Sequence, residues 1–268
     1  MRYNLTDRVV LITGASSGIG RACAVAYHRA GARVVVAARS ADKLESLAES
    51  LGADRVLPVT MDATIEADRD RTLALTRERF GPVDVLVNNA GWASFGSVVH
   101  LPPEHYQRMI ALNLSAPLAL IQAVLPEMIQ RGSGQIVNIA SVVGHQVIPR
   151  MTVYSATKAA LIALSTGLRM ELRGTGVDVL VVSPGSTRTE FFTSAAAIDA
   201  QAARLATWQQ TPERVARAVV RSSITRRREV ILTAEGISII LIRRLSPRLA
   251  DALINIVARR TMPPTEPK

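Results

Sequence analysis

A tyrosine and a lysine stand four residues apart, at Tyr154 and Lys158, in a stretch with helical character. That spacing places both side chains on one face of a helix. A free tyrosine titrates near pKa ~10 and is a poor base at neutral pH, but a neighbouring ammonium lowers that pKa. We therefore predict that Tyr154 is a general acid and base and that Lys158 lowers its pKa. Taken alone, the two residues could equally be an exposed helix pair.

Two other polar residues stand where they could take part in the same reaction. Ser141 follows the expected strand Gln135–Ala140, which would deliver it to the carboxyl end of a sheet, where ligands bind in open α/β folds. Asn113 lies where the helical stretch Pro103–Arg131 is expected to bend or break, around Asn113 and Pro117. The predicted catalytic residues are Ser141, Tyr154, Lys158 and Asn113.

A glycine-rich turn, Thr13–Gly20, lies between the first expected strand and a helix. Glycines let a backbone approach a pyrophosphate, and the helix offers free N–H groups and the positive end of its dipole. A plain strand-to-helix turn is the alternative, since a glycine pattern alone is a weak signal. The residues predicted to bind a dinucleotide here are Gly14, Ser16, Ser17, Gly18, Ile19 and Gly20.

A second loop follows the fourth expected strand and contributes Asn89, Ala90 and Gly91 to the predicted cofactor site. Gly91 would allow a cofactor to come close to the backbone. Asn88 and Asn89 could instead satisfy local backbone groups, which is the usual role of asparagine in loops.

The end of the second expected strand indicates which dinucleotide is bound. An acidic residue at this point would bind a ribose 2′-hydroxyl and repel a 2′-phosphate. This chain has Arg39 instead, with Lys43 one turn into the next helix. Because a guanidinium can pair with a phosphate in a forked geometry, we predict NADP(H) rather than NAD(H). The alternative is that Arg39 is merely a solvated side chain.

Short β-branched runs alternate with helical patterns along the chain. The expected strands are Val9–Thr13, Val34–Ala38, Val56–Thr60, Val83–Asn88, Gln135–Ala140, Val177–Ser183 and Glu229–Leu232. The expected helices are Gly18–Ala30, Ala41–Leu51, Glu66–Phe80, two within Pro103–Arg131, Thr152–Gly174 and one from Thr211. Continuous apolar strands are typical of parallel sheets covered on both faces. We predict an α/β fold with one doubly wound parallel sheet of about seven strands and helices on both faces.

Composition narrows the class of protein. The chain has 268 residues, 48% of them hydrophobic, which suits one large domain and excludes a disordered chain. A lone Cys23 and the lack of a secretory signal pattern lead us to expect the cytoplasm. The net charge of +10 could favour an anionic partner, but without a nucleic-acid-binding motif we expect no nucleic acid. The histidines show no metal-ligand grouping, so we expect no metal.

Together these motifs closely resemble the short-chain dehydrogenase/reductase family, from Val9 to about Leu232. The resemblance rests on the turn at Thr13–Gly20, Asn88–Gly91, Asn113, Ser141, Tyr154 with Lys158, and Pro184-Gly185 followed by Thr189. It implies a Rossmann-type catalytic domain over residues 1–235, holding both cofactor and substrate, and a separate extension over 236–268. It also implies a homodimer or homotetramer. Ala140 departs from the family, where a second serine is frequent, but Ser141 keeps the spacing to Tyr154.

The resemblance also implies a role for each matching residue. Ser141 would polarise the substrate carbonyl, Tyr154 would transfer the proton, and Lys158 would hold the nicotinamide ribose and lower the Tyr154 pKa. Asn113 would support a proton-relay water through its backbone, and Asp62 would bind the adenine. Thr189, with the turn at Pro184 and Gly185, would contact the nicotinamide carboxamide. The further cofactor contacts implied are Tyr154, Lys158 and Thr187.

Three stretches are expected to line the substrate pocket: 92–96, 145–149 and 190–208. Their apolar side chains favour a lipophilic carbonyl compound or alcohol, although each could instead be a core or lid residue. His145 is a candidate contact that the mechanism does not need. The predicted substrate residues are Trp92, Ser141, His145, Tyr154, Phe191 and Phe192.

The last segment joins an apolar run, Gly236–Ile242, to clustered arginines. The run is too short to span a bilayer, which needs roughly 20 residues. Apolar residues beside arginines suit a membrane interface or a partner subunit, and a similar extension occurs in membrane-associated hydroxysteroid and retinol-type relatives. A helix that completes the core is a further alternative. We expect the chain to be an enzyme. Peripheral contact with the inner membrane surface through residues 236–260 is one of the alternatives for this segment. The alternative function is a non-catalytic NADP(H)-binding or membrane-surface interaction protein.

Overall fold

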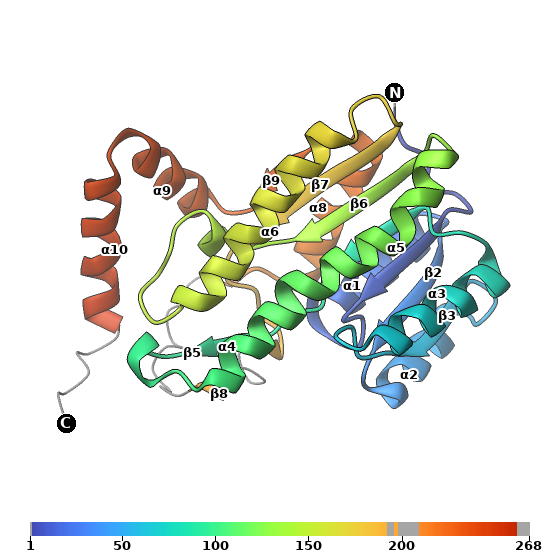
Figure 1. The fold of residues 1–268 in the computed structure, drawn as a ribbon, viewed down its shortest axis with the longest axis horizontal. Helices are drawn as coiled ribbons and strands as arrows, with labels where there is room; N and C mark the ends of the chain where they lie inside the picture. The colour runs from blue at the N-terminus through green and yellow to red at the C-terminus, as the bar shows by residue number, and fades with distance from the viewer. Residues whose placement is uncertain (1, 192–195, 198–208, 262–268) are drawn as a thin grey trace.

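The computed structural model describes residues 2–191, 196–197 and 209–261. Seven parallel strands form one sheet in the order β3-β2-β1-β4-β6-β7-β9 (Figure 1). Their bounds are β1 Val9–Thr13, β2 Arg33–Ala38, β3 Val56–Thr60, β4 Val85–Asn88, β6 Gly134–Ile139, β7 Val177–Ser183 and β9 Glu229–Ile231. The predicted doubly wound sheet is therefore confirmed.

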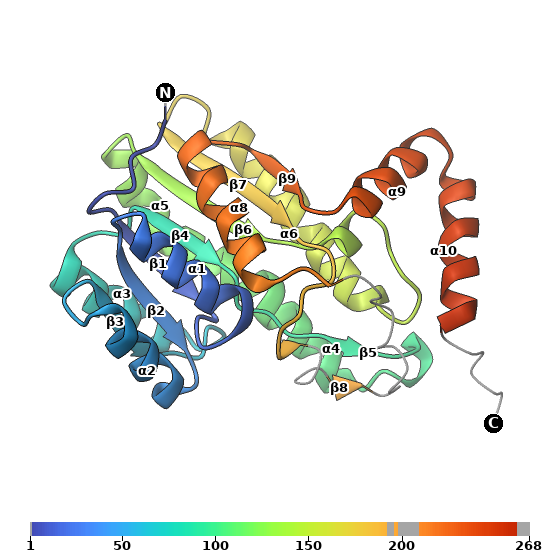
Figure 2. The same ribbon diagram turned by 180° about the vertical axis from the view of Figure 1, so that it is seen from behind.

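Helices cover both faces of this sheet. The bounds are α1 Gly18–Arg29, α2 Ala41–Leu51, α3 Glu66–Phe80, α4 Pro103–Ile110, α5 Ala116–Gln130, α6 Thr152–Glu171 and α8 Pro212–Thr225. Helices α1, α2 and α8 share one core with alternate strand residues such as Val10 and Ile12. Figure 2 shows these helices on the near side of the sheet. Helices α3, α5 and α6 pack on the other face, against Val9 and Leu11. Because β-strand side chains alternate between faces, both faces of β1 must be apolar, as its sequence is.

The long apolar stretch before β6 forms one continuous helix that contains a single wider turn. Helix α4 runs into a single π-helical turn, Ala111–Ser115, which continues as α5. Pro117 lacks the N–H group that an α-helix would direct at the Asn113 carbonyl, which favours a wider turn at this point. Where the sequence predicted a bend or break around Asn113 and Pro117, the structure thus has a π-helical turn within one continuous helix.

By length and composition alone, Pro103–Gln130 could cross a membrane, with 39% of its most apolar window buried inside the fold. Its buried residues Leu120, Ile121 and Val124 belong to the core between α5 and the sheet. That packing is what a core helix of an α/β domain makes, so its apolar character needs no membrane.

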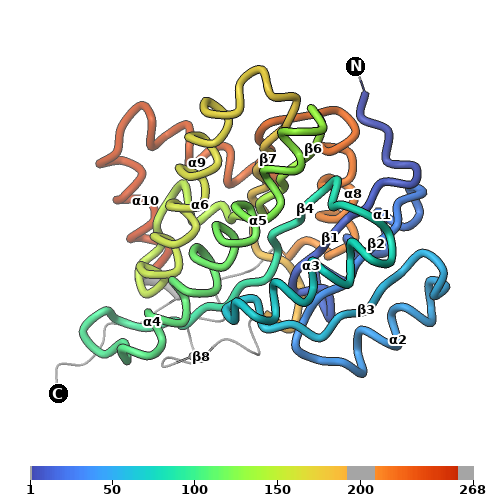
Figure 3. The backbone as a smooth tube through the Cα atoms, turned by 45° about the vertical axis from the view of Figure 1, so that its right-hand side comes forward, coloured from blue at the N-terminus to red at the C-terminus, as the bar shows by residue number. Residues whose placement is uncertain are grey.

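Two further helices follow β9. They are α9, Ala234–Leu245, and α10, Pro247–Thr261, separated at Ser246 before a proline that cannot continue α9. Figures 1 and 3 show them standing to one side of the domain, away from α1, α2 and α3. The short strands β5, Ser94–Phe95, and β8, Ala196–Ala197, pair with each other apart from the main sheet.

Candidate active site

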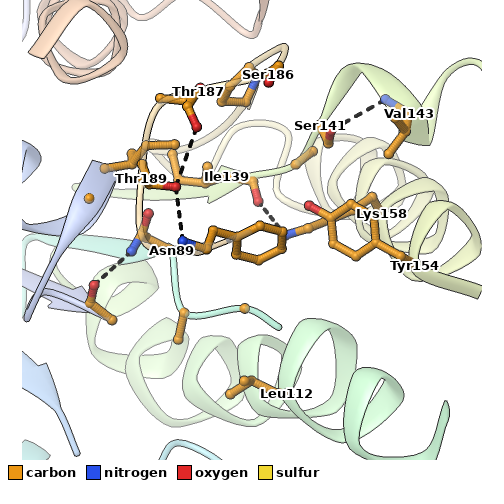
Figure 4. Close-up of a pocket in the computed structure, with 18 of the residues that line it drawn as sticks. Asn89, Leu112, Ile139, Ser141, Val143, Tyr154, Lys158, Ser186, Thr187 and Thr189 are labelled. Carbon is orange, nitrogen blue, oxygen red and sulfur yellow. Dashed lines mark hydrogen bonds between the residues drawn. The ribbon is translucent and has the colours of Figure 1, made fainter. Parts of the chain in front are cut away.

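A cavity of about 960 Å³ opens where the parallel strands end. Residues that follow β1, β2, β3, β4, β6 and β7 all reach it, because parallel strands present their carboxyl ends at one edge. Helix α6 and the α9–α10 pair supply further lining residues. Figure 4 shows part of this cavity, with Tyr154 and Lys158 approaching from α6 and Ser141 from the end of β6.

Tyr154 and Lys158 are both buried, with 7% and 4% of their surfaces exposed. The Lys158 Nζ donates a hydrogen bond to the Ile139 carbonyl at 2.9 Å and lies 5.9 Å from the centre of the Tyr154 ring. Ser141 caps the short 3₁₀ turn Val142–Gly144, where its Oγ accepts from the Val143 N–H at 3.4 Å. The chain therefore brings the three predicted side chains together, from one helix and one strand end.

Burial dominates the ionisation of this pair. Burial raises the pKa of Tyr154, and the Ser141 hydroxyl acts in the opposite direction. Burial also lowers the pKa of Lys158 to about 8. In the protein without ligands the pKa of Tyr154 is therefore raised, not lowered as predicted, because the phenol is desolvated.

Asn113 is completely buried within the π-turn, and its side chain holds a neighbouring loop. Its Oδ1 accepts from the Trp92 N–H at 2.9 Å, and its Nδ2 donates to the Trp92 carbonyl at 2.8 Å. Nδ2 also contacts the Thr157 Oγ1 at 3.1 Å. The Asn113 amide therefore fixes the loop after β4 against α6, which leaves only the Asn113 backbone for the implied relay.

The glycine turn forms a cradle that a side chain would fill. Gly14 and Gly18 both have positive φ, at 65° and 54°. A Cβ on Gly14 would lie 2.9 Å from the Ala90 Cα, and one on Gly18 would lie 2.9 Å from the Thr189 Cγ2. Asn89 fastens the turn to the end of β4, because its Nδ2 donates to the carbonyls of Thr13 and Gly14 at 2.9 and 3.1 Å.

The N-terminus of α1 faces this cradle with the features of an anion site. Ser17 is its N-cap residue but makes no side-chain capping bond, and the first turn carries no acidic residue. The first N–H groups and the dipole of α1 can therefore serve an anion, which a phosphate would supply. Gly14, Ser16, Ser17, Gly18 and Ile19 line the cavity, as predicted, and the residues present fit a dinucleotide.

Several charged residues line the cavity beside the ends of β2 and β3. Arg39 is exposed after β2 and makes no hydrogen bond or ion pair within the described part of the chain. Lys43 donates to Glu190 Oε2 at 2.8 Å. Burial raises the pKa of Asp62, but the bonds from Thr64 and the nearby Arg39 outweigh it, so the net pKa is lowered and the carboxylate is charged at neutral pH.

The segment after β7 forms the opposite wall. Thr187 is buried and donates from its Oγ1 to the Gly185 carbonyl at 3.1 Å, and the Thr189 Oγ1 accepts from the Phe191 N–H at 3.3 Å. Ser186, which was not predicted, also lines the cavity, and its buried Oγ has no hydrogen-bond partner among the described residues. Pro184, Gly185, Thr187 and Thr189 line the cavity as predicted.

Two predicted substrate contacts, Trp92 and His145, are not among the residues that line the cavity. The His145 Nε2 is 3.0 Å from the Ser183 Oγ and 3.7 Å from Glu229 Oε1, so this ring turns toward β7 and β9 and does not line the cavity. The Trp92 ring is covered by the Arg108 guanidinium, 4.3 Å from its centre, and is also outside the cavity lining. Trp92 still packs in the same buried cluster as Tyr154 and Met151, whereas the His145 ring is held by β7 and β9.

The two phenylalanines predicted as substrate contacts differ, because Phe191 borders the cavity while Phe192 lies outside the described residues. The Phe191 ring lines the cavity, with its centre 5.7 Å from that of Tyr154. Sequence reasoning missed the wall formed by α9 and α10, whose lining residues include Ile239, Leu253, Ile254 and Val257. The spacing of Leu253 and Val257 indicates one helix face, but not which part of the protein that face meets.

The chain is similar to known proteins over most of its length. A family model described as short chain dehydrogenase matches residues 8–199. Dehydrogenase/reductase SDR family member 7B of Bos taurus is 34% identical over 275 residues, covering 97% of this chain and 84% of that protein. The structure of a short-chain dehydrogenase from Streptomyces avermitilis has a TM-score of 0.82 at 33% identity, covering 95% of this chain and 98% of that one.

Two other similar structures were solved with a cofactor. A 3-ketoacyl-(acyl-carrier-protein) reductase from Brucella melitensis, complexed with NADH, has a TM-score of 0.77 at 26% identity and covers 85% of this chain and 97% of its own. A serine dehydrogenase complexed with NADP⁺ has a TM-score of 0.77 at 31% identity and covers 84% and 94%. Such neighbours bind nicotinamide dinucleotides of both kinds.

Proposed function

Since this chain belongs to the short-chain dehydrogenase/reductase family, we propose that it is an NADP(H)-dependent oxidoreductase that interconverts a carbonyl and an alcohol on a lipophilic small molecule. The observation that carries the proposal is the meeting of Tyr154, Ser141 and Lys158 at a cavity that also reaches the glycine turn and Arg39.

The bound cofactor would supply or accept the hydride, and the side chains of this chain would handle the proton. In reduction, Tyr154 donates its proton to the substrate oxygen while the Ser141 hydroxyl holds that oxygen in place. The raised pKa keeps Tyr154 in the neutral, proton-donating form at neutral pH. Lys158, with a pKa of about 8, is largely protonated at pH 7 and is placed to hold the nicotinamide ribose.

The preference for NADP(H) rests on the charge at the end of β2. Arg39 lines the cavity, is exposed, and has no hydrogen-bond or ion-pair partner among the described residues. A phosphate can therefore take its guanidinium without breaking an existing bond. A ribose 2′-hydroxyl gains less from a cation at this position.

The lipophilic character of the substrate rests on the walls around Tyr154. Apolar side chains from four segments meet there, and Ser141, Tyr154 and Ser186 are polar groups among them. Such a site favours a molecule with a large apolar body and a single oxygen function near Tyr154. The apolar lining residues are Val143, Ile148, Met151, Phe191, Ile239, Leu253, Ile254 and Val257.

We also propose cytoplasmic location and assembly as a homodimer or homotetramer, with peripheral membrane contact through α9–α10. The C-terminal apolar face, made of Leu241, Leu245, Leu249 and Ile256, is exposed, and 88% of the Leu245 surface meets solvent. Arg244 and Arg248 beside it are also exposed. Exposed apolar side chains next to arginines suit the surface of an anionic membrane.

An NADPH-consumption screen over lipophilic ketones and aldehydes, run beside NADH, tests the proposal. We expect turnover with NADPH on at least one such compound and weaker turnover with NADH. Equal or better turnover with NADH would refute the proposed preference for NADP(H). Tight NADPH binding without turnover across the panel would support the alternative of a non-catalytic NADP(H)-binding protein.

A further inference from the structure

An ion pair bridges the two sides of the cavity mouth. The Lys43 Nζ, in the first turn of α2, lies 2.8 Å from Glu190 Oε2, which belongs to the segment after β7. The two residues are 147 positions apart in the chain, and both line the cavity. The side chains remain 50% and 63% exposed, so the pair lies at the rim, where a ligand entering from solvent would meet it.

The two cations expected to meet a 2′-phosphate therefore differ in the protein without ligands. Arg39 has no hydrogen-bond or ion-pair partner among the described residues, whereas Lys43 is already held by a carboxylate. An exposed ion pair contributes little to stability, because water and salt screen it. A phosphate dianion carries more charge and more acceptor oxygens than a carboxylate, so it can take Lys43 from Glu190.

Resting on the NADP(H) preference proposed above, we propose that Glu190 is a specificity-determining residue that holds Lys43 until the cofactor 2′-phosphate takes it. Breaking the Lys43–Glu190 pair costs free energy only when a 2′-phosphate binds. A cofactor with a 2′-hydroxyl leaves the pair intact and avoids this cost. Glu190 thus narrows the difference in affinity between the two nicotinamide dinucleotides.

Binding of two small probes to the full chain distinguishes the effect of Glu190 on a ligand with a 2′-phosphate from its effect on a ligand without one. Adenosine 2′,5′-bisphosphate carries the 2′-phosphate, and adenosine 5′-monophosphate lacks it. Calorimetry gives the Kd of each probe for the wild type, Glu190→Gln, Lys43→Gln and the double variant. Glu49→Gln is the matched control, because Glu49 is an exposed glutamate on α2 that does not line the cavity.

We expect Glu190→Gln to bind the bisphosphate about two- to fivefold more tightly, the range set by exposed ion pairs, with the monophosphate unchanged. The gain should vanish in the Lys43→Gln background, and Glu49→Gln should show none. An equal gain in bisphosphate affinity with and without Lys43, or no gain at all, would refute the proposal that the 2′-phosphate takes Lys43 from Glu190. If the wild type itself does not prefer the bisphosphate, the NADP(H) proposal fails first, and that single measurement reveals it.

Discussion

The Lys158 ammonium donates to the Ile139 carbonyl at 2.9 Å, so α6 is tied to the end of β6 two residues before Ser141. This bond sets the position of Tyr154 relative to Ser141, since both Tyr154 and Lys158 project from α6. Burial is the main cause of both pKa shifts, raising the pKa of Tyr154 and lowering that of Lys158.

The burial of Lys158 makes stability depend on pH. Its folded pKa is about 8, below the ordinary value of 10.5, so the unfolded chain binds more protons between these two values. Stability must therefore rise with pH across that window, and this gain should be absent in Lys158→Met. From pH 7 to pH 9.5 we expect the free energy of unfolding of the wild type to rise by about 1–2 kcal/mol more than that of the variant.

Urea unfolding at both pH values measures that difference. The window stops below pH 10 because the raised pKa of Tyr154 has the opposite effect, and the folded state loses stability once the unfolded tyrosine ionises. An equal pH dependence in the wild type and Lys158→Met would show that the ammonium is not desolvated as described.

Arg39 should decide the cofactor. Arg39→Gln removes a charge-assisted bond to the 2′-phosphate, so the Kd for NADPH should rise about 10- to 100-fold while the Kd for NADH stays unchanged. Fluorescence titration with each cofactor measures both constants. Arg173→Gln is the control, because Arg173 is exposed beyond the end of α6 and outside the cavity. Equal weakening for both cofactors would refute a specific role in phosphate binding.

The C-terminal apolar face should bind vesicles that contain anionic lipid. Leu245→Asp places a charge at its most exposed residue and should abolish flotation of the full chain with such vesicles. Val99→Asp is the control, because Val99 is 85% exposed but lies outside α9–α10. If the wild-type protein does not float with the vesicles, the proposed membrane contact is refuted. A smaller assembly for Leu245→Asp in size-exclusion chromatography would assign the face to a partner subunit.

Local sequence pattern was enough to predict the sheet and the residues that follow its strands. Continuous apolar runs located all seven strands, because parallel strands buried on both faces need them. The glycine turn, Arg39 and Ser141 are each adjacent to a strand end, so their place at the cavity follows from the sheet itself.

Contacts between distant segments were not predictable in this way. Trp92 and His145 stand in loops that reach the site, but Asn113 holds the Trp92 backbone, while Ser183 and Glu229 turn the His145 ring away. The wall formed by Ile239, Leu253 and Val257 depends on how α9–α10 folds back over the cavity. Helical periodicity reveals an apolar face but not the surface it packs against.

The central claim is that Tyr154 transfers the proton, and Tyr154→Phe tests it most directly. The phenyl ring keeps the packing against Phe191 and loses only the hydroxyl, so NADPH should bind with an unchanged Kd. Once a substrate is identified by the carbonyl screen, kcat should fall by about 10²- to 10⁴-fold, the usual contribution of a general acid. A Tyr154→Phe variant that keeps a large part of the wild-type kcat would contradict the account.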